Sequence, residues 1–263
     1  MSAKFARPVT AFFLVLALSK QTEMKANPPA AEAQQQVYHA IVQNQIEALQ
    51  TLLQQGSNPN ARVAPGKEDA WMLQDRPNDD PAPPLLVTAC RFGCLDSKAV
   101  GMLIAKGAKV NVADKNGVTP LMAASELDWD PSIALLLEHG AKTQAKDQNG
   151  KTALMYAMSN RGLGAAAKLL GKGADINDSD KAGRTPLMYA ITQAARDTIL
   201  LFGEDEVKKE KLAKERYLEL VAFLIAQKAD VNAKDAGGNT PLMLATAQRQ
   251  PEIVQRLKRA GAK

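Results

Sequence analysis

Residues able to carry catalysis or to hold a metal are few in this sequence of 263 residues. It has two histidines, His39 and His139, and two cysteines, Cys90 and Cys94. No Ser or Cys nucleophile shares a motif with a histidine, no Gly-rich phosphate loop is present, and no Cys/His set has metal-ligand spacing. The sequence therefore predicts a protein that is not an enzyme and that uses no metal and no cofactor.

The two cysteines, in the segment "TACRFGCLD", are four residues apart. If a helix ends between them, at the bend that Gly93 permits, their Cα atoms come within the reach of a disulfide. An oxidising compartment would favour a Cys90–Cys94 bridge, and two buried thiols are the alternative. We do not expect zinc, because two thiols without a neighbouring histidine are too few ligands.

Acidic residues recur at regular places, but their surroundings are those of turns. The segments "DKNGVTPLM", "DQNGKTALM", "DKAGRTPLM" and "DAGGNTPLM" begin at Asp114, Asp147, Asp180 and Asp235. In each, a polar turn with glycine leads to a threonine, usually followed by proline, as at a helix start with a hydroxyl cap. We expect the four aspartates to serve these turns and not to form an acid–base set.

The threonines of these segments reveal the elements that the turns must join. Thr119, Thr152, Thr185 and Thr240 are 33, 33 and 55 residues apart, so the period is 33 residues with an insertion before the last copy. Each turn is followed by a short helix of small apolar residues and then by a second helix, such as "PSIALLLEHGA". Such a hairpin cannot bury its apolar face alone, so neighbouring copies must stack.

The segments "TPLMAA", "TALMYA", "TPLMYA" and "TPLMLA", together with "GAKVN", "GADIN" and "KADVN", resemble the ankyrin repeat. The resemblance covers about residues 35–262 and implies an all-α solenoid of about six helix-turn-helix units with β-turn or hairpin loops. The units are expected near residues 35–56, 84–107, 117–140, 150–173, 183–228 and 238–261, with the first and last as caps.

The sequence departs from the family where a histidine usually follows Thr-Pro-Leu. Methionine stands there, as Met122, Met155, Met188 and Met243. We expect these four side chains to stack in the core, and a metal-binding methionine row is the alternative. The resemblance places His139 at an ordinary helix end and His39 in the capping helix.

Two insertions interrupt the repeats. The first, about residues 62–83, carries Trp71, Met72 and Leu73 among acidic residues and prolines, which is typical of an interaction anchor or of a cover for the first repeat. The second, about residues 192–216, continues the helical apolar spacing and ends in a tip with equal numbers of acidic and basic residues. It predicts a solvated helical finger, either with a partner role or as a passive extension.

In ankyrin proteins the turn tips and the exposed face of the first helices form the usual contact surface. Carried over to this sequence, the resemblance assigns partner binding to Lys115, Asn116, Val118, Lys146, Gln148, Lys151, Lys181, Arg184, Lys234 and Asn239. Six of these ten residues are basic, so the stripe would favour a partner with an acidic surface. A row of charges that only solubilises the turns is the alternative.

The N-terminal segment has the form of a signal peptide. Lys4 and Arg7 precede the apolar run 9–18. Ten helical residues extend about 15 Å, half of a hydrocarbon core of about 30 Å, so no stable membrane span is expected. We expect residues 1–19 to be a signal peptide, residues 20–36 a flexible tether and residues 37–263 the repeat domain. An uncleaved inner-membrane anchor and a cytoplasmic chain are the alternatives.

Composition agrees with helical repeats and argues against nucleic acid as the partner. The chain is 46% apolar but only 5% aromatic, and its 33 basic and 28 acidic residues give a mixed surface of charge +5. The sequence thus predicts an exported, bacterial-type protein-binding module, monomeric alone, which assists a periplasmic enzyme. The alternatives are an immunity-type protein that neutralises a secreted toxin, and an enzyme with an unrecognised site in the insertions.

Overall fold

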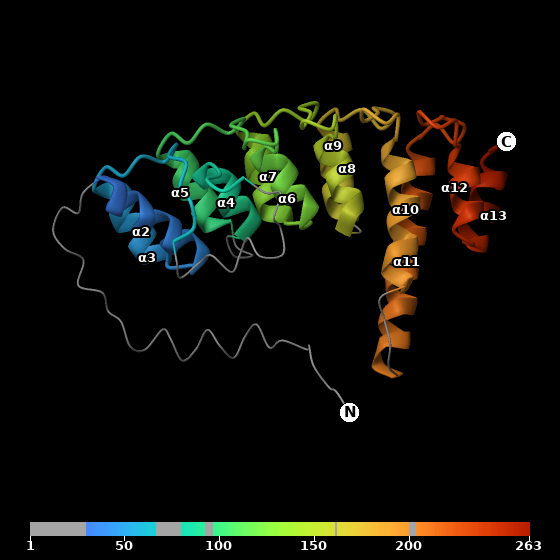
Figure 1. The fold of residues 1–263 in the computed structure, drawn as a ribbon, viewed down its shortest axis with the longest axis horizontal. Helices are drawn as coiled ribbons and strands as arrows, with labels where there is room; N and C mark the ends of the chain where they lie inside the picture. The colour runs from blue at the N-terminus through green and yellow to red at the C-terminus, as the bar shows by residue number, and fades with distance from the viewer. Residues whose placement is uncertain (1–29, 67–79, 93–96, 161, 200–203) are drawn as a thin grey trace.

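The computed structural model describes residues 30–66, 80–92, 97–160, 162–199 and 204–263. Within these ranges the chain forms six helical hairpins stacked in sequence order, and the predicted all-α fold is confirmed (Figure 1). The pairs are α2 (Ala30–Val42) with α3 (Ile46–Gln54), α4 (Leu85–Phe92) with α5 (Lys98–Ala105), α6 (Pro120–Glu126) with α7 (Asp130–Glu138), α8 (Ala153–Ala157) with α9 (Leu163–Gly171), α10 (Pro186–Ile199) with α11 (Glu204–Ala226), and α12 (Pro241–Ala247) with α13 (Pro251–Arg259). A 3₁₀ turn, η2 (Met158–Asn160), follows α8.

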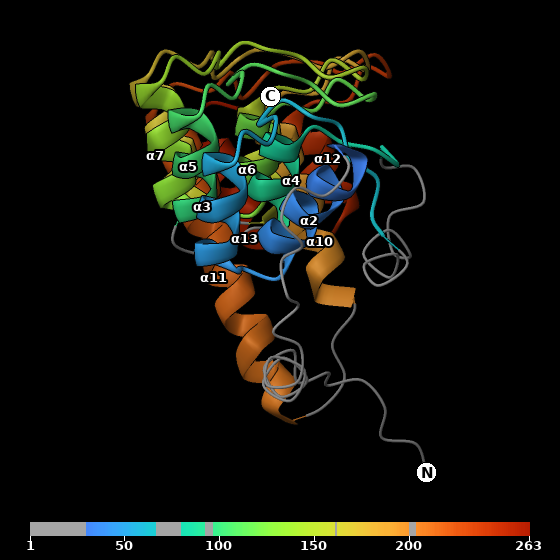
Figure 2. The same ribbon diagram turned by 90° about the vertical axis from the view of Figure 1, so that its left-hand side faces the viewer.

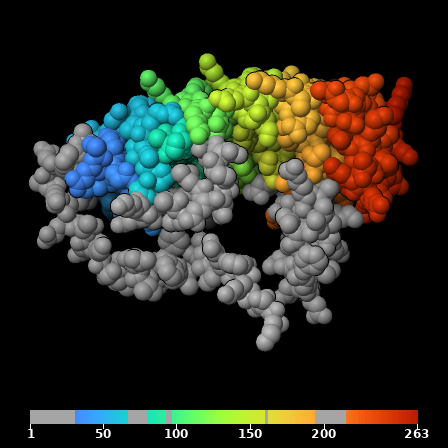
Figure 3. All heavy atoms as spheres, in the orientation of Figure 1, coloured from blue at the N-terminus to red at the C-terminus, as the bar shows by residue number. Residues whose placement is uncertain are grey.

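The helices form two layers, and the turns between repeats run along one edge of the stack (Figure 2). The first helices of consecutive pairs pack on one another, as α6 does between α4 and α8, and we call this layer the inner layer. The second helices form the other layer, in which α7 contacts α9. In the space-filling view the repeats make one continuous, elongated body (Figure 3).

The predicted helix starts are confirmed by their caps. The Oγ1 of Thr119 accepts the N–H of Met122 at 3.3 Å, and Thr240 does the same for Met243 at 3.3 Å. A proline in the first turn of α6 and of α12 completes this start. The Thr152 hydroxyl departs from the pattern, because it has no hydrogen-bond partner.

The row of four methionines divides into buried members and an exposed one. Met122, Met155 and Met188 are at most 1% exposed, as expected of core side chains. Met243 is 55% exposed, so the prediction that it packs in the core is wrong. Its helix, α12, belongs to the last described hairpin, and the described residues provide no further helix that packs over this side chain.

The first helix starts earlier than the sequence suggested. Helix α2 begins at Ala30, whereas we expected a flexible tether up to residue 36 and folded structure from Val37. The segment "AAEAQQQ" consists of strong helix formers and contains no Gly or Pro, so the packed helix can extend backwards through it. The predicted signal peptide lies outside the described residues.

The fifth hairpin is longer than the others, in agreement with the predicted finger. Helix α10 has 14 residues and α11 has 23, and both extend well beyond the neighbouring helices (Figure 1). The C-terminal end of α11 is anchored in the core, where Tyr217, Leu220, Val221 and Leu224 are at most 1% exposed.

Candidate functional site

The edge of the stack is built by the four recurrent aspartates. The Oδ1 of Asp147 accepts the backbone N–H groups of Asn149 and Lys151, both at 2.8 Å. Asp114, Asp180 and Asp235 make the same two bonds, to the residues two and four positions later. This confirms that the aspartates serve the turns.

Consecutive turns are joined to one another by backbone hydrogen bonds. The N–H of Gln148 donates to the carbonyl of Asn116 at 2.8 Å, and that of Lys181 donates to Asn149 at 2.9 Å. A third bond, from Ala236 to Ala182 at 2.8 Å, continues the series to the last turn. The turn tips of repeats three to six therefore form one connected edge.

The second oxygen of the aspartate has a hydrogen-bond partner in repeats four, five and six, and the partner differs between them. In repeats four and five, the hydroxyl groups of Tyr156 and Tyr189 donate to the Oδ2 of Asp147 and Asp180 at 2.9 and 2.6 Å. Arg184 adds two further bonds to Asp180, at 2.9 and 3.0 Å. In repeat six, the amide of Asn239 donates to Asp235 at 3.0 Å.

Repeat three lacks such a bond. The Oδ2 of Asp114 is buried without a hydrogen-bond partner, and the nearest guanidinium nitrogen of Arg91 lies 4.0 Å away. Burial raises the pKa of Asp114. Burial also opposes ionisation of Asp180, but the bonds from Tyr189 and Arg184 outweigh it and lower the pKa of that carboxyl. The surroundings of the same turn residue thus differ along the stack.

The predicted partner-binding residues lie on this edge, with one exception. Lys115, Lys146, Gln148, Lys181, Lys234 and Asn239 are exposed, and Asn116, Lys151 and Arg184 are half-buried. Val118 is only 5% exposed, so its assignment to the contact surface is wrong. The apolar Val118 occupies the turn position that carries Lys151 and Arg184 in the next repeats, and it turns into the core instead.

Two of the predicted cations are neutralised within the chain. The Nζ of Lys146 lies 2.6 Å from the Oδ1 of Asp178, and Arg184 pairs with Asp180. Lys115, Lys181 and Lys234 have no ion pair among the described residues. The positive stripe therefore depends on these three exposed lysines and on the half-buried Lys151.

Tyr156 and Tyr189 also lie on this surface, beside the cations, although the sequence did not lead us to predict them as surface residues. The Nζ of Lys151 lies 5.7 Å from the ring centre of Tyr156 and 5.0 Å from that of Tyr189. The guanidinium of Arg184 lies 4.9 Å from the Tyr189 ring. The sequence contained a sign of this pairing, because two of the four tyrosines occupy the same repeat position, in "TALMYA" and "TPLMYA".

The base of the first insertion is fixed to the third repeat through Asp80, which is only 4% exposed. Its carboxylate pairs with Arg62 and accepts the N–H of Lys115 at 2.7 Å. The carbonyl of Ala113 in turn accepts a bond from Arg62 at 3.1 Å. Trp71, the predicted anchor, lies outside the described residues.

Cys90 is fully buried in α4 and has no disulfide partner among the described residues, and burial raises the pKa of its thiol. Cys94 lies outside the described residues, so the Cys90–Cys94 bridge stays a prediction.

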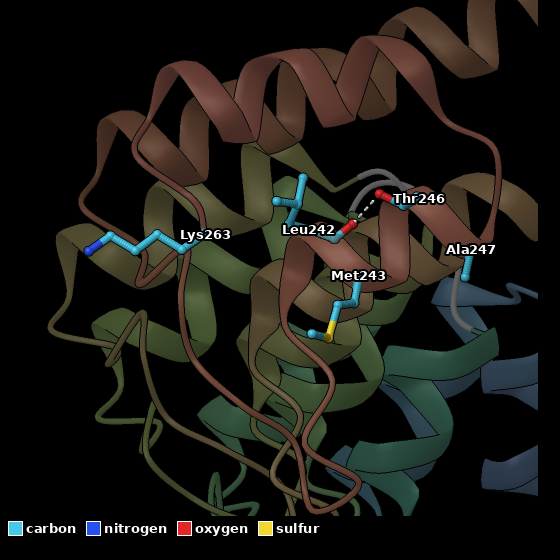
Figure 4. Close-up of a pocket in the computed structure, with 5 residues that line it drawn as sticks. All are labelled: Leu242, Met243, Thr246, Ala247 and Lys263. Carbon is cyan, nitrogen blue, oxygen red and sulfur yellow. Dashed lines mark hydrogen bonds between the residues drawn. The ribbon is translucent and has the colours of Figure 1, made fainter.

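An open hollow is present at the far end of the stack, against α12 (Figure 4). Its lining comprises Leu242, Met243, Thr246, Ala247 and Lys263. The Thr246 hydroxyl donates to the carbonyl of Leu242 at 2.7 Å, so it is engaged within its own helix. The hollow thus presents mainly apolar surface and the Lys263 side chain.

Within the described ranges, no three side chains of His, Cys, Asp or Glu gather as metal ligands would, and no helix has the length and apolar character needed to cross a membrane.

Comparison with protein families identifies the repeats. A family model described as ankyrin repeats (three copies) matches residues 86–180, and a second, described as ankyrin repeats (many copies), matches residues 210–257. No curated protein sequence matches the chain. The two matches fall on the stacked hairpins and together span more than half of the sequence, and on this evidence the chain belongs to the ankyrin repeat family.

Proposed function

We propose that this chain binds a partner protein with an acidic surface, without catalysis, through the turn edge of its repeats. The observation that carries the proposal is the row of exposed lysines Lys115, Lys181 and Lys234, each on a different turn. The turns are already ordered by the aspartate bonds and by the bonds between turns. Binding would therefore cost little conformational entropy, which favours affinity.

The spacing of these lysines sets the size of the partner surface. Helices of adjacent repeats pack about 10 Å apart, so Lys115 and Lys181, which are two repeats apart, span about 20 Å. Lys234 extends the row by one further repeat. A partner must present carboxylates over about 30 Å to engage all three, which suits a folded acidic surface.

The proposed partner is an exported enzyme that this chain assists. The basic residues and the short apolar run of residues 1–19 support export of the chain to the periplasm. An immunity-type role against a secreted toxin makes the opposite prediction for the partner's activity. An assisted enzyme should be more active or longer-lived in the complex, and a toxin should be inhibited.

Affinity capture tests the proposal with residues 20–263 as bait. The edge variant changes Lys115, Lys181 and Lys234 to Gln. The matched control changes three other exposed lysines, Lys106, Lys172 and Lys258, to Gln. We expect wild type and control to retain the same acidic protein and the edge variant to lose it. Equal retention by all three baits would contradict the proposal.

A further inference from the structure

Tyr156 and Tyr189 form a regular pair on the inner layer. They stand at the same position of α8 and α10, the first helices of repeats four and five. Each hydroxyl is bound to the aspartate of its own turn, which fixes the direction of the ring. Repeats three and six have Ala123 and Leu244 at this position. The aromatic pair is therefore confined to two neighbouring repeats.

Lys151 places a positive charge, without an ion-pair partner among the described residues, next to the two tyrosine rings. Its ammonium is within 6 Å of both ring centres, the range of a cation–π interaction. No carboxylate of the described residues forms an ion pair with it. Arg184, the second cation at the rings, is already held by Asp180.

The nearby aspartates do not remove the positive character of the surface. Asp147 and Asp180 are 7% and 6% exposed, and their oxygens are taken up by turn amides and tyrosine hydroxyls. Lys151 and Arg184 are more open, and Lys181 is exposed on the next turn tip. A further carboxylate, that of the half-buried Glu126, also acts on Tyr156. Lys151, Arg184 and Lys181 outnumber it, so the net charge that meets solvent is positive.

The two cations beside the tyrosine rings determine which charge a ligand of this surface must carry. Aromatic clusters with free faces bind cations, but here the chain's own Lys151 and Arg184 already lie against the rings. A cationic segment would be repelled. A carboxylate could approach Lys151 and meet the positively polarised edges of the rings, while a neighbouring apolar side chain packs on the part of the rings that Lys151 and Arg184 leave uncovered.

We propose that Lys151, Tyr156, Arg184 and Tyr189 form a binding site for an extended segment of the partner that carries a carboxylate next to an aromatic or apolar residue. Three extended residues cover about 10 Å, the distance between neighbouring helices, so a short segment can lie across both α8 and α10, which carry Tyr156 and Tyr189. The inference rests on the proposed function for the identity of the partner.

The site can be tested without the partner, by NMR of the full chain labelled at its tyrosine rings. The probe is the peptide acetyl-Gly-Glu-Ala-Phe-Gly-amide, and the matched peptide has Gln in place of Glu. The four tyrosines provide internal references, because Tyr38 and Tyr217 are only 1% exposed. We expect the Glu peptide to shift the signals of Tyr156 and Tyr189 and to leave the other two unchanged.

The charge requirement is tested by variants of one residue. Loss of a charged hydrogen bond should weaken binding about tenfold or more, both for the Gln peptide and for Lys151→Met. Lys151→Arg, which keeps the charge, should restore most of the affinity. Equal binding of the Glu and Gln peptides, unchanged binding by Lys151→Met, or unmoved signals of Tyr156 and Tyr189 would overturn the inference.

The two proposals fail in different ways. A captured partner that binds Lys151→Met as well as wild type but is lost by the edge variant would leave the proposed function standing and refute this site. Binding of the Glu peptide at the two tyrosines would support the site even where no partner is captured.

Discussion

The turns of repeats four and six are built alike, yet only the first of them is covered by a following repeat. Asp147 and Asp235 make the same pair of backbone bonds. A Cβ placed on Gly150 would lie 2.8 Å from the backbone nitrogen of Lys181, whereas one on the equivalent Gly238 meets nothing within 4 Å. The same glycine position of equivalent turns thus contributes differently to stability, depending on the neighbouring repeat.

Substitution of the equivalent methionines should reveal this difference most strongly. Met155→Ala opens a cavity in the core and should cost about 3 kcal/mol of the free energy of unfolding. Met243→Ala removes a side chain that is 55% exposed and should cost less than about 0.5 kcal/mol. Urea unfolding followed by circular dichroism measures both. Equal losses would show that α12 is covered in solution.

The turn glycines test the contact between repeats. Gly150 and Gly238 have φ values of +81° and +80°, so alanine strains both backbones by about 1–2 kcal/mol. Only at Gly150 does the added Cβ also press on the next turn, which should cost a further 1–3 kcal/mol or so. Thermal unfolding of the two variants compares them directly. The prediction fails if Gly150→Ala and Gly238→Ala have the same midpoint.

Tyr189→Phe isolates the bond that repeat five has and repeat six lacks. It removes one donor from Asp180, while Arg184 stays, and should cost about 1 kcal/mol at pH 7. The pKa of Asp180 is lowered in the folded protein, so its stabilisation is present above the unfolded value of 3.8 and is lost as pH falls through the folded pKa. The difference between variant and wild type should therefore shrink at pH 3. A difference independent of pH would exclude this role for the bond.

The elements that depend on local sequence could be predicted. The threonine caps and the 33-residue period predict the repeat boundaries, because a cap depends only on residues of its own turn and the period only on the recurrence of one segment. Gly140, with φ of +80°, ends its hairpin as a left-handed residue should. The start of α2 at Ala30 could not be predicted from apolar periodicity, because its "AAEAQQQ" segment has helix propensity but no apolar pattern.

The surface was harder to predict because its charges pair across repeats. Lys146 reaches Asp178, 32 residues later, and no local pattern signals that contact. Val118 could have been recognised as a core residue, since it is apolar where Lys151 and Arg184 are charged. Met243 is exposed because no described helix packs over it, and the repeat pattern alone does not distinguish this position from the buried methionines.

The most direct test of the account is the salt dependence of binding to a captured partner. Between about 0.1 M and 1 M salt the screening length falls from about 10 Å to about 3 Å, so attraction between exposed charges is largely lost. We predict that association with wild type and with the Lys106, Lys172 and Lys258 control slows strongly over this range. The variant without Lys115, Lys181 and Lys234 should associate slowly at both concentrations. Association that is equally fast for all three proteins, and independent of salt, would contradict a positive turn edge as the binding surface.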